Sequence, residues 1–173
     1  WIHRSGAVLD LGIAGGYRED RLDWNIAGNS NGQNPNVLSE LKWRDIEIGQ
    51  VKLQSKFTLP RRFHFRSSFG TGWIANGDNR DSDYLGDDRT FEYSRTDNSA
   101  DHGSVYDFSA AAGYPFEFGR EMVIALRPLV GYSYHRQNLS ITDGDQTVAT
   151  PGLTQNAGPF AGLDSHYDAR WYG

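Results

Sequence analysis

The sequence predicts an all-β protein, an antiparallel up-and-down β-barrel that crosses a membrane. The chain has 173 residues with 20 Gly, 9 Tyr, 9 Phe and 5 Trp but a single Met and no Cys, a composition that favours strands. Apolar and polar residues alternate over long segments, which is the period of a strand with two different faces. Tight turns and long polar loops also alternate along the chain, as in barrels whose two ends face different compartments.

The overall polarity of the chain is compatible with such a barrel. The mean hydropathy is −0.63, and no run of about 18 apolar residues exists, so a helical span is excluded. Barrel strands alternate lipid-facing and lumen-facing residues, and they therefore average to polar. The net charge of −5, without a basic stripe, argues against a nucleic-acid partner. We predict no cofactor and no metal, because the chain has no phosphate-binding Gly loop and no Cys/His cluster.

Six segments carry the alternation of a strand. They run from about Val8 to Ile26, Leu38 to Leu59, Phe63 to Trp73, Ser104 to Phe118, Met122 to Ile141 and Leu163 to Trp171. The third is the clearest, because aromatic residues occupy one face and Arg, His, Ser and Gly the other. In the second, the apolar phase changes between Trp43 and Ile46, so we expect a β-bulge near Arg44 to Asp45.

The two faces of these segments differ in a way that suits a membrane barrel. The apolar faces carry aromatic residues near their ends, as in the girdles of outer-membrane strands, and the other faces carry charged residues. We predict that lipid surrounds the apolar faces. The polar faces should enclose a lumen whose charge network contains Arg62, His64, Arg66, Arg127, His135, Asp164, His166, Asp168 and Arg170. Buried charges need partners, so ion pairs should fill a narrow lumen and leave no open channel.

The connections alternate in length. Leu59 to Arg62 and Phe118 to Glu121 are predicted to be tight turns, whereas polar loops cover about 27–37, 77–103 and 142–158. Short turns at one end and long loops at the other are typical of outer-membrane proteins of Gram-negative bacteria, with periplasmic turns and extracellular loops. Several segments exceed the ~9–11 residues that cross a membrane, so we expect them to project beyond the bilayer on the loop side.

Six strands are too few for a single-chain barrel, since such barrels start at eight strands. We expect residues 1–173 to be a single barrel domain that lacks further strands on its C-terminal side, because the chain stops in what looks like mid-strand. A barrel shared by several chains is the alternative.

Three stretches of the sequence resemble a known family. They are NVLSELKW from Asn36, GDNRDSDYLGDD from Gly77 and LRPLVGYSYHRQNLSI from Leu126. These stretches, and the order of turns and loops over nearly the whole chain, are similar to omptins, the outer-membrane proteases. They are also similar to related non-proteolytic barrels such as the Protochlamydia outer-membrane protein group. The resemblance implies a ten-stranded barrel.

The resemblance also implies a candidate catalytic pair. Omptins place an Asp pair in the second loop and an Asp-His pair in the fourth, and a water between them attacks the peptide. Asp81 and Asp83 match the first pair in spacing and place, but the fourth loop is not in this chain and Tyr84 stands where omptins often have Trp. The same loop is also compatible with a solvated acidic surface or with Ca²⁺ binding. Asp164 and His166 have Asp-x-His spacing but fall on a different strand.

Three functions remain open. The favoured one is a structural or interaction barrel without catalysis, which presents long polar loops outside the cell. Its partners would be outer-membrane lipid, including lipopolysaccharide, and a protein at the extracellular loops. The second is an omptin-type endopeptidase, and the third is a small channel or a barrel that sheathes another protein.

Overall fold

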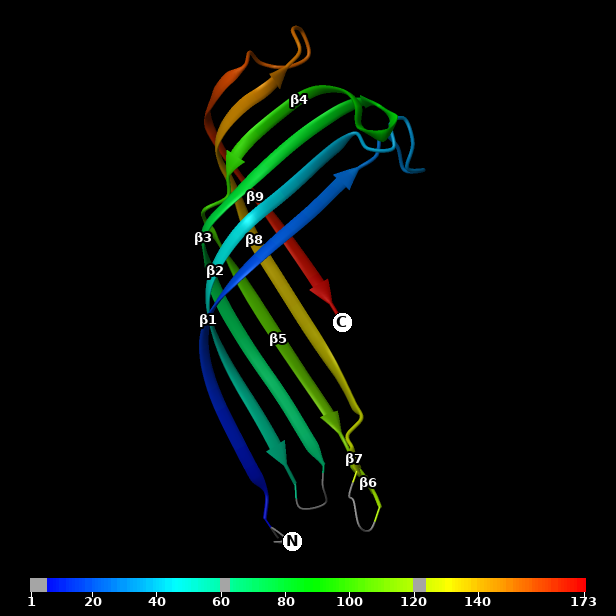
Figure 1. Ribbon diagram of the computed structural model, residues 1–173, viewed down its shortest axis with the longest axis vertical. Coiled ribbons are helices and arrows are strands. Elements are labelled where there is room, and N and C mark those ends of the chain that lie inside the picture. The colour runs from blue at the N-terminus through cyan, green and yellow to red at the C-terminus, as the bar shows by residue number, and fades with distance from the viewer. Residues whose placement is uncertain (1–5, 60–62, 120–123) are drawn as a thin grey trace.

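The computed structural model describes residues 6–59, 63–119 and 124–173, and these residues form an all-β protein (Figure 1). The long strands are β1 (Val8–Ile26), β2 (Ser39–Thr58), β3 (His64–Gly86), β4 (Thr90–Ser99), β5 (Gly103–Gly113), β8 (Leu129–Ala149) and β9 (Gly158–Tyr172). Three short elements complete the fold: the 3-10 turn η1 (Asp87–Arg89) and the strands β6 (Phe116–Phe118) and β7 (Ile124–Leu126). No helix in the described part of the chain is long and apolar enough to cross a membrane.

The long strands form one antiparallel up-and-down sheet. β1, β2 and β3 are successive neighbours, and β8 pairs with β9. Between β3 and β8 lie both β4 and β5, end to end, so they occupy one strand position interrupted at 100–102. The antiparallel all-β architecture and its six strand positions therefore agree with the sequence-based prediction. The sheet is open among the described residues, with β1 and β9 as its edges.

Two predicted loops are largely strand. Residues 77–103 were expected to be a polar loop, but β3 continues to Gly86 and β4 returns from Thr90, with Asp78 paired to Ser99. β8 likewise extends to Ala149, and only about half of the predicted loop 142–158 is irregular. The hydropathy pattern misses these extensions because both of their faces are rich in polar residues. Cross-strand ion pairs hold them instead, such as the one between Arg80 and Asp97 at 2.6 Å.

The predicted β-bulge in β2 is confirmed. Asp20 pairs with Ile46 and Leu22 with Trp43, so Arg44 and Asp45 together face a single residue of β1. Asp45 has a φ of 51°, in the left-handed region that Asp and Asn tolerate better than most residues. The bulge returns Trp43 to the face that Ile46 occupies.

One face of the sheet, here called the outward face, carries apolar residues, most of them exposed, in rows that cross β1, β2, β3, β5, β8 and β9. One such row contains Ile13, Leu53, Phe69, Phe108, Tyr134 and Tyr172. Phe63, Phe65, Phe69 and Trp73 are between 41% and 61% exposed, so they are not packed in a core. This exposure is what the sequence predicts for side chains that face lipid.

The other face, here called the inner face, holds the hydrophobic core near the end that carries η1, the loop end. The core contains Trp43, Ile46, Ile48, Ile74, Ala100, Val105, Leu139 and Ile141. The sheet is curved strongly enough that its two edges meet there. The ring of Tyr167 on β9 lies 5.8 Å from that of Trp24 on β1 and 4.9 Å from that of Trp43. The loop end is thus a folded unit with its own core.

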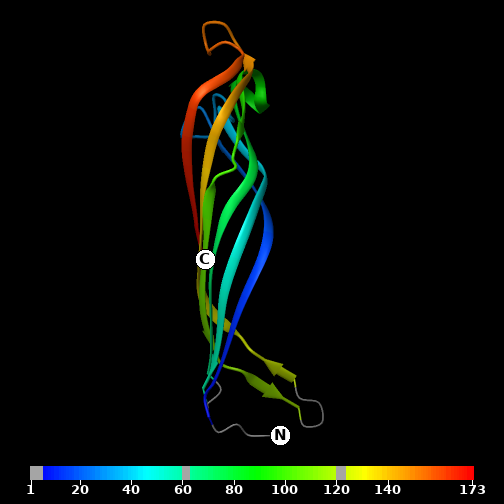
Figure 2. The ribbon, with the colours of Figure 1, turned by 90° about the vertical axis from the view of Figure 1, so that its left-hand side faces the viewer.

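The opposite end of the sheet, here called the turn end, is modified by a pair of prolines. The ladder between β5 and β8 stops at Gly113 and Leu129, next to Pro115 and Pro128. Proline cannot donate a ladder hydrogen bond, so the hairpin of β6 and β7 forms a separate two-stranded sheet. Figure 2 shows that this hairpin turns out of the plane of the main sheet.

Candidate functional site

The outward face changes its chemistry towards the loop end. Above the row that contains Trp73, ion pairs replace the apolar side chains. Arg44 lies 2.5 Å from Asp23, and Glu40 is buried between Lys42 and Arg89, each at 2.7 Å. Polarity therefore inverts along the strands: the turn end is apolar outside and polar inside, whereas the loop end is ionic outside and apolar inside. Such an inversion suits a protein that passes from lipid into water along its length.

Asp81 and Asp83 lie on the inner face of β3 near the loop end. Their cross-strand partners on β2 are Leu41 and Ser39, which share the face of Trp43. Both carboxylates are half-buried, and Ser39 Oγ donates a hydrogen bond to Asp81 Oδ1 at 3.3 Å. The resemblance to omptins places this pair in the second loop, whereas the structure puts it on the inner face of β3.

The electrostatics of this pair suit proton transfer. Burial, together with the negative charge of Asp83, raises the pKa of Asp81 to about 6. Burial and the same two carboxylates raise the pKa of Tyr93. A carboxyl group that gains or loses its proton near neutral pH is a candidate general acid or base. Among the described residues, however, no hydrogen bond or ion pair joins a histidine to Asp81 or Asp83.

The acidic stretch around this pair does not converge on a cation. No cluster of three or more His, Asp or Glu side chains in the described ranges could hold a metal ion. The two acidic residues of η1 accept hydrogen bonds from Asn36 instead. The backbone N–H of Asn36 donates to Asp87 Oδ1 and the side-chain amide of Asn36 donates to Asp88 Oδ1, both at 2.8 Å. These contacts attach η1 to the loop that precedes β2.

The charged residues of β9 lie on the face opposite to the expected one. Alternation along this strand predicts that Asp164, His166, Asp168 and Arg170 lie in the lumen. The register pairs Arg170 with Arg136 and puts these four side chains on the outward face. Asp168 binds Arg136 at 2.8 Å and Arg170 at 2.6 Å, while Asp164 and His166 are exposed and 3.5 Å apart. Their place on the outward face separates Asp164 and His166 from Asp81.

A physical reason for this difference is visible on the inner face. The alternate residues of β9 pack there, where the ring of Tyr167 contacts Trp43 and that of Trp171 lies 5.0 Å from His135. Packing of Leu163 and Tyr167 against the hydrophobic core outweighs any gain from more charges inside.

The other residues of the expected lumen network are partly on the inner face. His64, buried and 3.0 Å from Thr58 Oγ1, lies there with Arg66 and His135. Arg127 is exposed between β7 and β8. Arg62 lies outside the described residues.

An ionic network that the pattern of single strands does not predict crosses the inner face between the core and the turn end. Arg18 on β1 contacts Asp20 at 2.9 Å and Asp107 on β5 at 3.2 Å. Asp107 also accepts from His135 at 2.5 Å, and Gln137 donates to Asp20 at 2.6 Å. The residues of this network are far apart in the sequence. The one sequence signal for it is the alternation of β1, which predicts that Arg18 lies on the polar face. The network joins β1 to β5 and β8 across the interior.

These features define a class of protein. It is an antiparallel sheet of long strands whose outward face is compatible with lipid towards the turn end and with water towards the loop end. The model of the Protochlamydia outer membrane protein family matches residues 12–173. The chain therefore belongs to this family and is a protein of the bacterial outer membrane. The match confirms the resemblance to the Protochlamydia group, but it does not extend to the omptin proteases. No curated protein and no solved structure matches the chain.

Proposed function

We propose that the chain forms part of a closed outer-membrane β-barrel whose tall strands present a polar interaction surface outside the cell. Open strand edges do not occur in the hydrocarbon region of a membrane, so the edges β1 and β9 must be paired there. The inversion of polarity along the outward face carries the proposal. It predicts that β3 and β4, with η1 at their tip, project into the medium and contact a protein partner.

Single-cysteine labelling tests this arrangement, because the chain has no native Cys. Thr90→Cys at the exposed start of β4 should react with a membrane-impermeant maleimide on intact cells. Ala110→Cys, on the outward face of β5 in the apolar band, should react only after solubilisation. Protection of Thr90→Cys, or ready labelling of Ala110→Cys in intact cells, contradicts the proposal.

Lipopolysaccharide is the lipid partner that the outward face supports best. Arg136 and Arg170 lie one row towards the loop end from Tyr134 and Tyr172, and Asp168 bridges the two guanidinium groups. Guanidinium groups beside aromatic rings at a membrane boundary suit phosphorylated lipid headgroups. The variant Arg136→Gln/Arg170→Gln should co-purify with less lipopolysaccharide than the parent, while Arg21→Gln should not differ. Equal amounts in all three proteins would reject this partner.

Endopeptidase activity is the second candidate, favoured by the raised pKa of Asp81 beside Asp83. In this mechanism the pair would assist attack by a water molecule, with a histidine supplied from outside the described residues. The test is cleavage of a fluorogenic dibasic peptide by the refolded protein. Cleavage that is lost in Asp83→Ala supports the activity, and absence of cleavage in the parent rejects it.

A further inference from the structure

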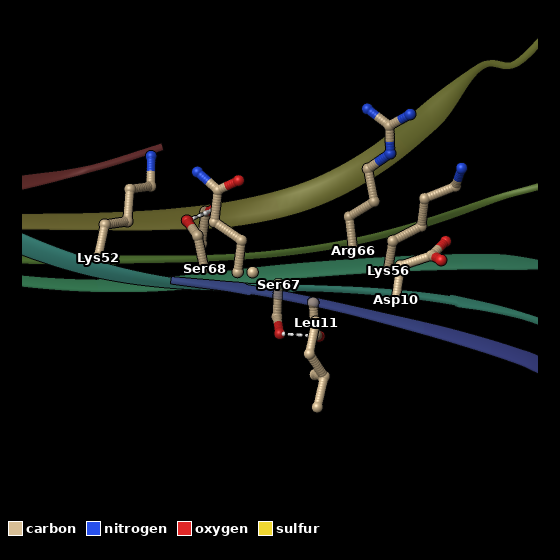
Figure 3. A pocket seen from close by; sticks show the side chains of 11 residues that line it. Asp10, Leu11, Lys52, Lys56, Arg66, Ser67 and Ser68 are labelled. Atoms are coloured by element: carbon tan, nitrogen blue, oxygen red, sulfur yellow. Dashed lines mark hydrogen bonds between the residues drawn. The ribbon is translucent and has the colours of Figure 1, made fainter. Parts of the chain in front are cut away.

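The inner face near the turn end carries basic side chains that the functions proposed above do not use. Lys52 and Lys56 come from β2, and Arg66 comes from β3. Figure 3 shows these three side chains on one side of the sheet, whereas Leu11 and Ser67 point to the other side. Lys56 and Arg66 are direct cross-strand partners. Like charges directly opposite each other are destabilising, so packing alone does not explain this arrangement.

No carboxylate in the described ranges forms an ion pair with any of these three cations. Asp10 is the cross-strand partner of Lys56 on β1, but it does not reach within ion-pair distance. Asp107 lies in the row that contains Lys52, but its carboxylate already contacts Arg18 at 3.2 Å and His135 at 2.5 Å. Among the described residues, Asp10 is therefore the one acid beside Lys56 and Arg66 on this part of the inner face.

Small residues leave space in front of these cations. A recess of about 460 Å³ is lined by Asp10, Lys52, Lys56, Arg66, Ser68 and Ser109. A Cβ added at Gly12 would meet nothing within 4 Å. Ser68 and Ser109 share a hydrogen bond of 2.8 Å on the floor of the recess, which leaves one of the two hydroxyl groups free to donate to a ligand. The recess is large enough for a small polyatomic ion with its hydration water.

The recess is bounded on one side only. Towards the loop end, the ionic network of Arg18, Asp20, Asp107, His135 and Gln137 crosses the inner face. The hydrophobic core lies beyond it. A ligand would therefore enter the recess from the turn end, which is the periplasmic end in the barrel proposed above.

We propose that this recess is a binding site for a multiply charged oxyanion of the phosphate class. A guanidinium group, two ammonium groups and the one hydroxyl group left free by the Ser68–Ser109 hydrogen bond supply charge-assisted and neutral donors for phosphate oxygens. Enclosure by low-dielectric walls strengthens these interactions, so the site rests on the proposed closed barrel. The bound anion compensates the repulsion between Lys56 and Arg66.

Calorimetric titration of the full-length protein, folded in detergent, with inorganic pyrophosphate tests the site. The parent should bind one pyrophosphate saturably, and Lys56→Gln or Arg66→Gln should weaken binding about tenfold. Arg21→Gln, which removes an exposed charge from the outward face, is the matched control and should bind like the parent. Competition by a water-soluble short-chain phosphatidic acid assigns the site to lipid headgroups, and lack of competition assigns it to soluble phosphates.

The unfolding midpoint in denaturant separates ligand binding from a structural role. In the absence of anion, Lys56→Gln should unfold at a higher denaturant concentration than the parent, because it relieves a like-charge contact. Absence of saturable binding, or equal binding by all four proteins, overturns the proposal and means that carboxylates elsewhere in the protein neutralise the cations. Because the titration is done in detergent, this outcome is distinct from a failure of the cysteine labelling that tests the membrane arrangement.

Discussion

At the scale of single residues, two carboxyl groups have opposite pKa shifts: that of Asp81, which is half-buried, and that of Glu40, which is buried. Asp81 loses solvent and faces the charge of Asp83, so its proton is held more tightly in the folded protein. Hydrogen bonds from Arg89 and Lys42 hold the pKa of Glu40 below its usual range, although burial acts against them. The two groups should therefore change stability with pH in opposite directions.

Asp81→Asn should stabilise the protein at pH 7.5. The folded pKa of about 6 lies above the unfolded value, so the cost of burying the charged form builds up between about pH 4 and pH 6 and is complete above pH 6. Because the group is only half-buried, we expect a gain of about 1–2 kcal/mol, which should fade between pH 6 and pH 4. Denaturant unfolding over this pH range measures it. A gain that is the same at pH 4 and pH 7.5 would show that desolvated charge is not the cause.

Glu40→Gln should destabilise the loop end. Arg89 and Lys42 both contact this buried carboxylate at 2.7 Å, and their partial exposure limits the expected loss to about 1–3 kcal/mol. Because the folded pKa is lowered, the loss should be present above about pH 4.3 and vanish as the pH falls through the folded pKa. Unfolding in denaturant at pH 7 and pH 3 tests this. Glu19→Gln, at an exposed position on β1, should have little effect at either pH.

At the scale of elements, the bulge in β2 decides which face of the sheet receives Trp43, on the loop-end side of the bulge. Two residues, Arg44 and Asp45, oppose one residue of β1, and this shift puts Trp43 in the core. Without the shift, Trp43 would return to the outward face. The bulge is thus the point at which the strand changes from a membrane pattern to the pattern of a water-exposed sheet.

Insertion of one residue after Asp45 should abolish correct folding of the loop end, whereas deletion of Asp45 should preserve it. The insertion changes the phase of the strand and turns Trp43 outward, while the deletion removes the extra residue of the bulge and leaves Trp43 opposite Leu22 on the inner face. Asp45→Gly should also preserve the fold, because glycine accepts the φ of 51° without strain. Tryptophan fluorescence and resistance to protease measure the outcome. An insertion variant with the emission maximum and protease resistance of the parent would show that the phase of β2 does not decide the fold of the loop end.

At the scale of the whole molecule, the protein joins two sheets of opposite polarity in one set of strands. β2 and β3, of 20 and 23 residues, are about twice as long as a membrane crossing requires. The extra length lets the strands continue beyond the apolar rows and form a core in which side chains of the edges β1 and β9 meet. The polar part of the inner face remains below this core, and it contains the recess with Lys56 and Arg66.

Arginine at neighbouring positions of β2 should have very different effects on insertion into membranes. Leu53→Arg puts a charge in the middle of the outward apolar rows and should cost about 2–4 kcal/mol. Gln54→Arg puts the same charge on the inner face beside Lys52 and Lys56, where water reaches it, and should cost less. The folded fraction after refolding into lipid vesicles measures both. Equal losses would mean that the outward face does not face lipid.

The sequence by itself determined the all-β antiparallel class, the six strand positions, the exposed aromatic face and the bulge at Arg44 and Asp45. Each follows from local alternation, which is a property of neighbouring residues. The resemblance to omptins singled out Asp81 and Asp83 but placed them in a loop, whereas the structure has both residues on β3.

Only the tertiary structure decided which face of β9 turns inward, how far the strands extend beyond 77 and 142, and how Arg18 reaches Asp107. Alternation specifies that two faces differ but not which of them faces the core. In the membrane the apolar face turns outward, whereas above the membrane the apolar face must turn inward, away from water. That choice depends on register and curvature, which bring Tyr167 to Trp43 across the sheet, and neither is encoded in any single segment.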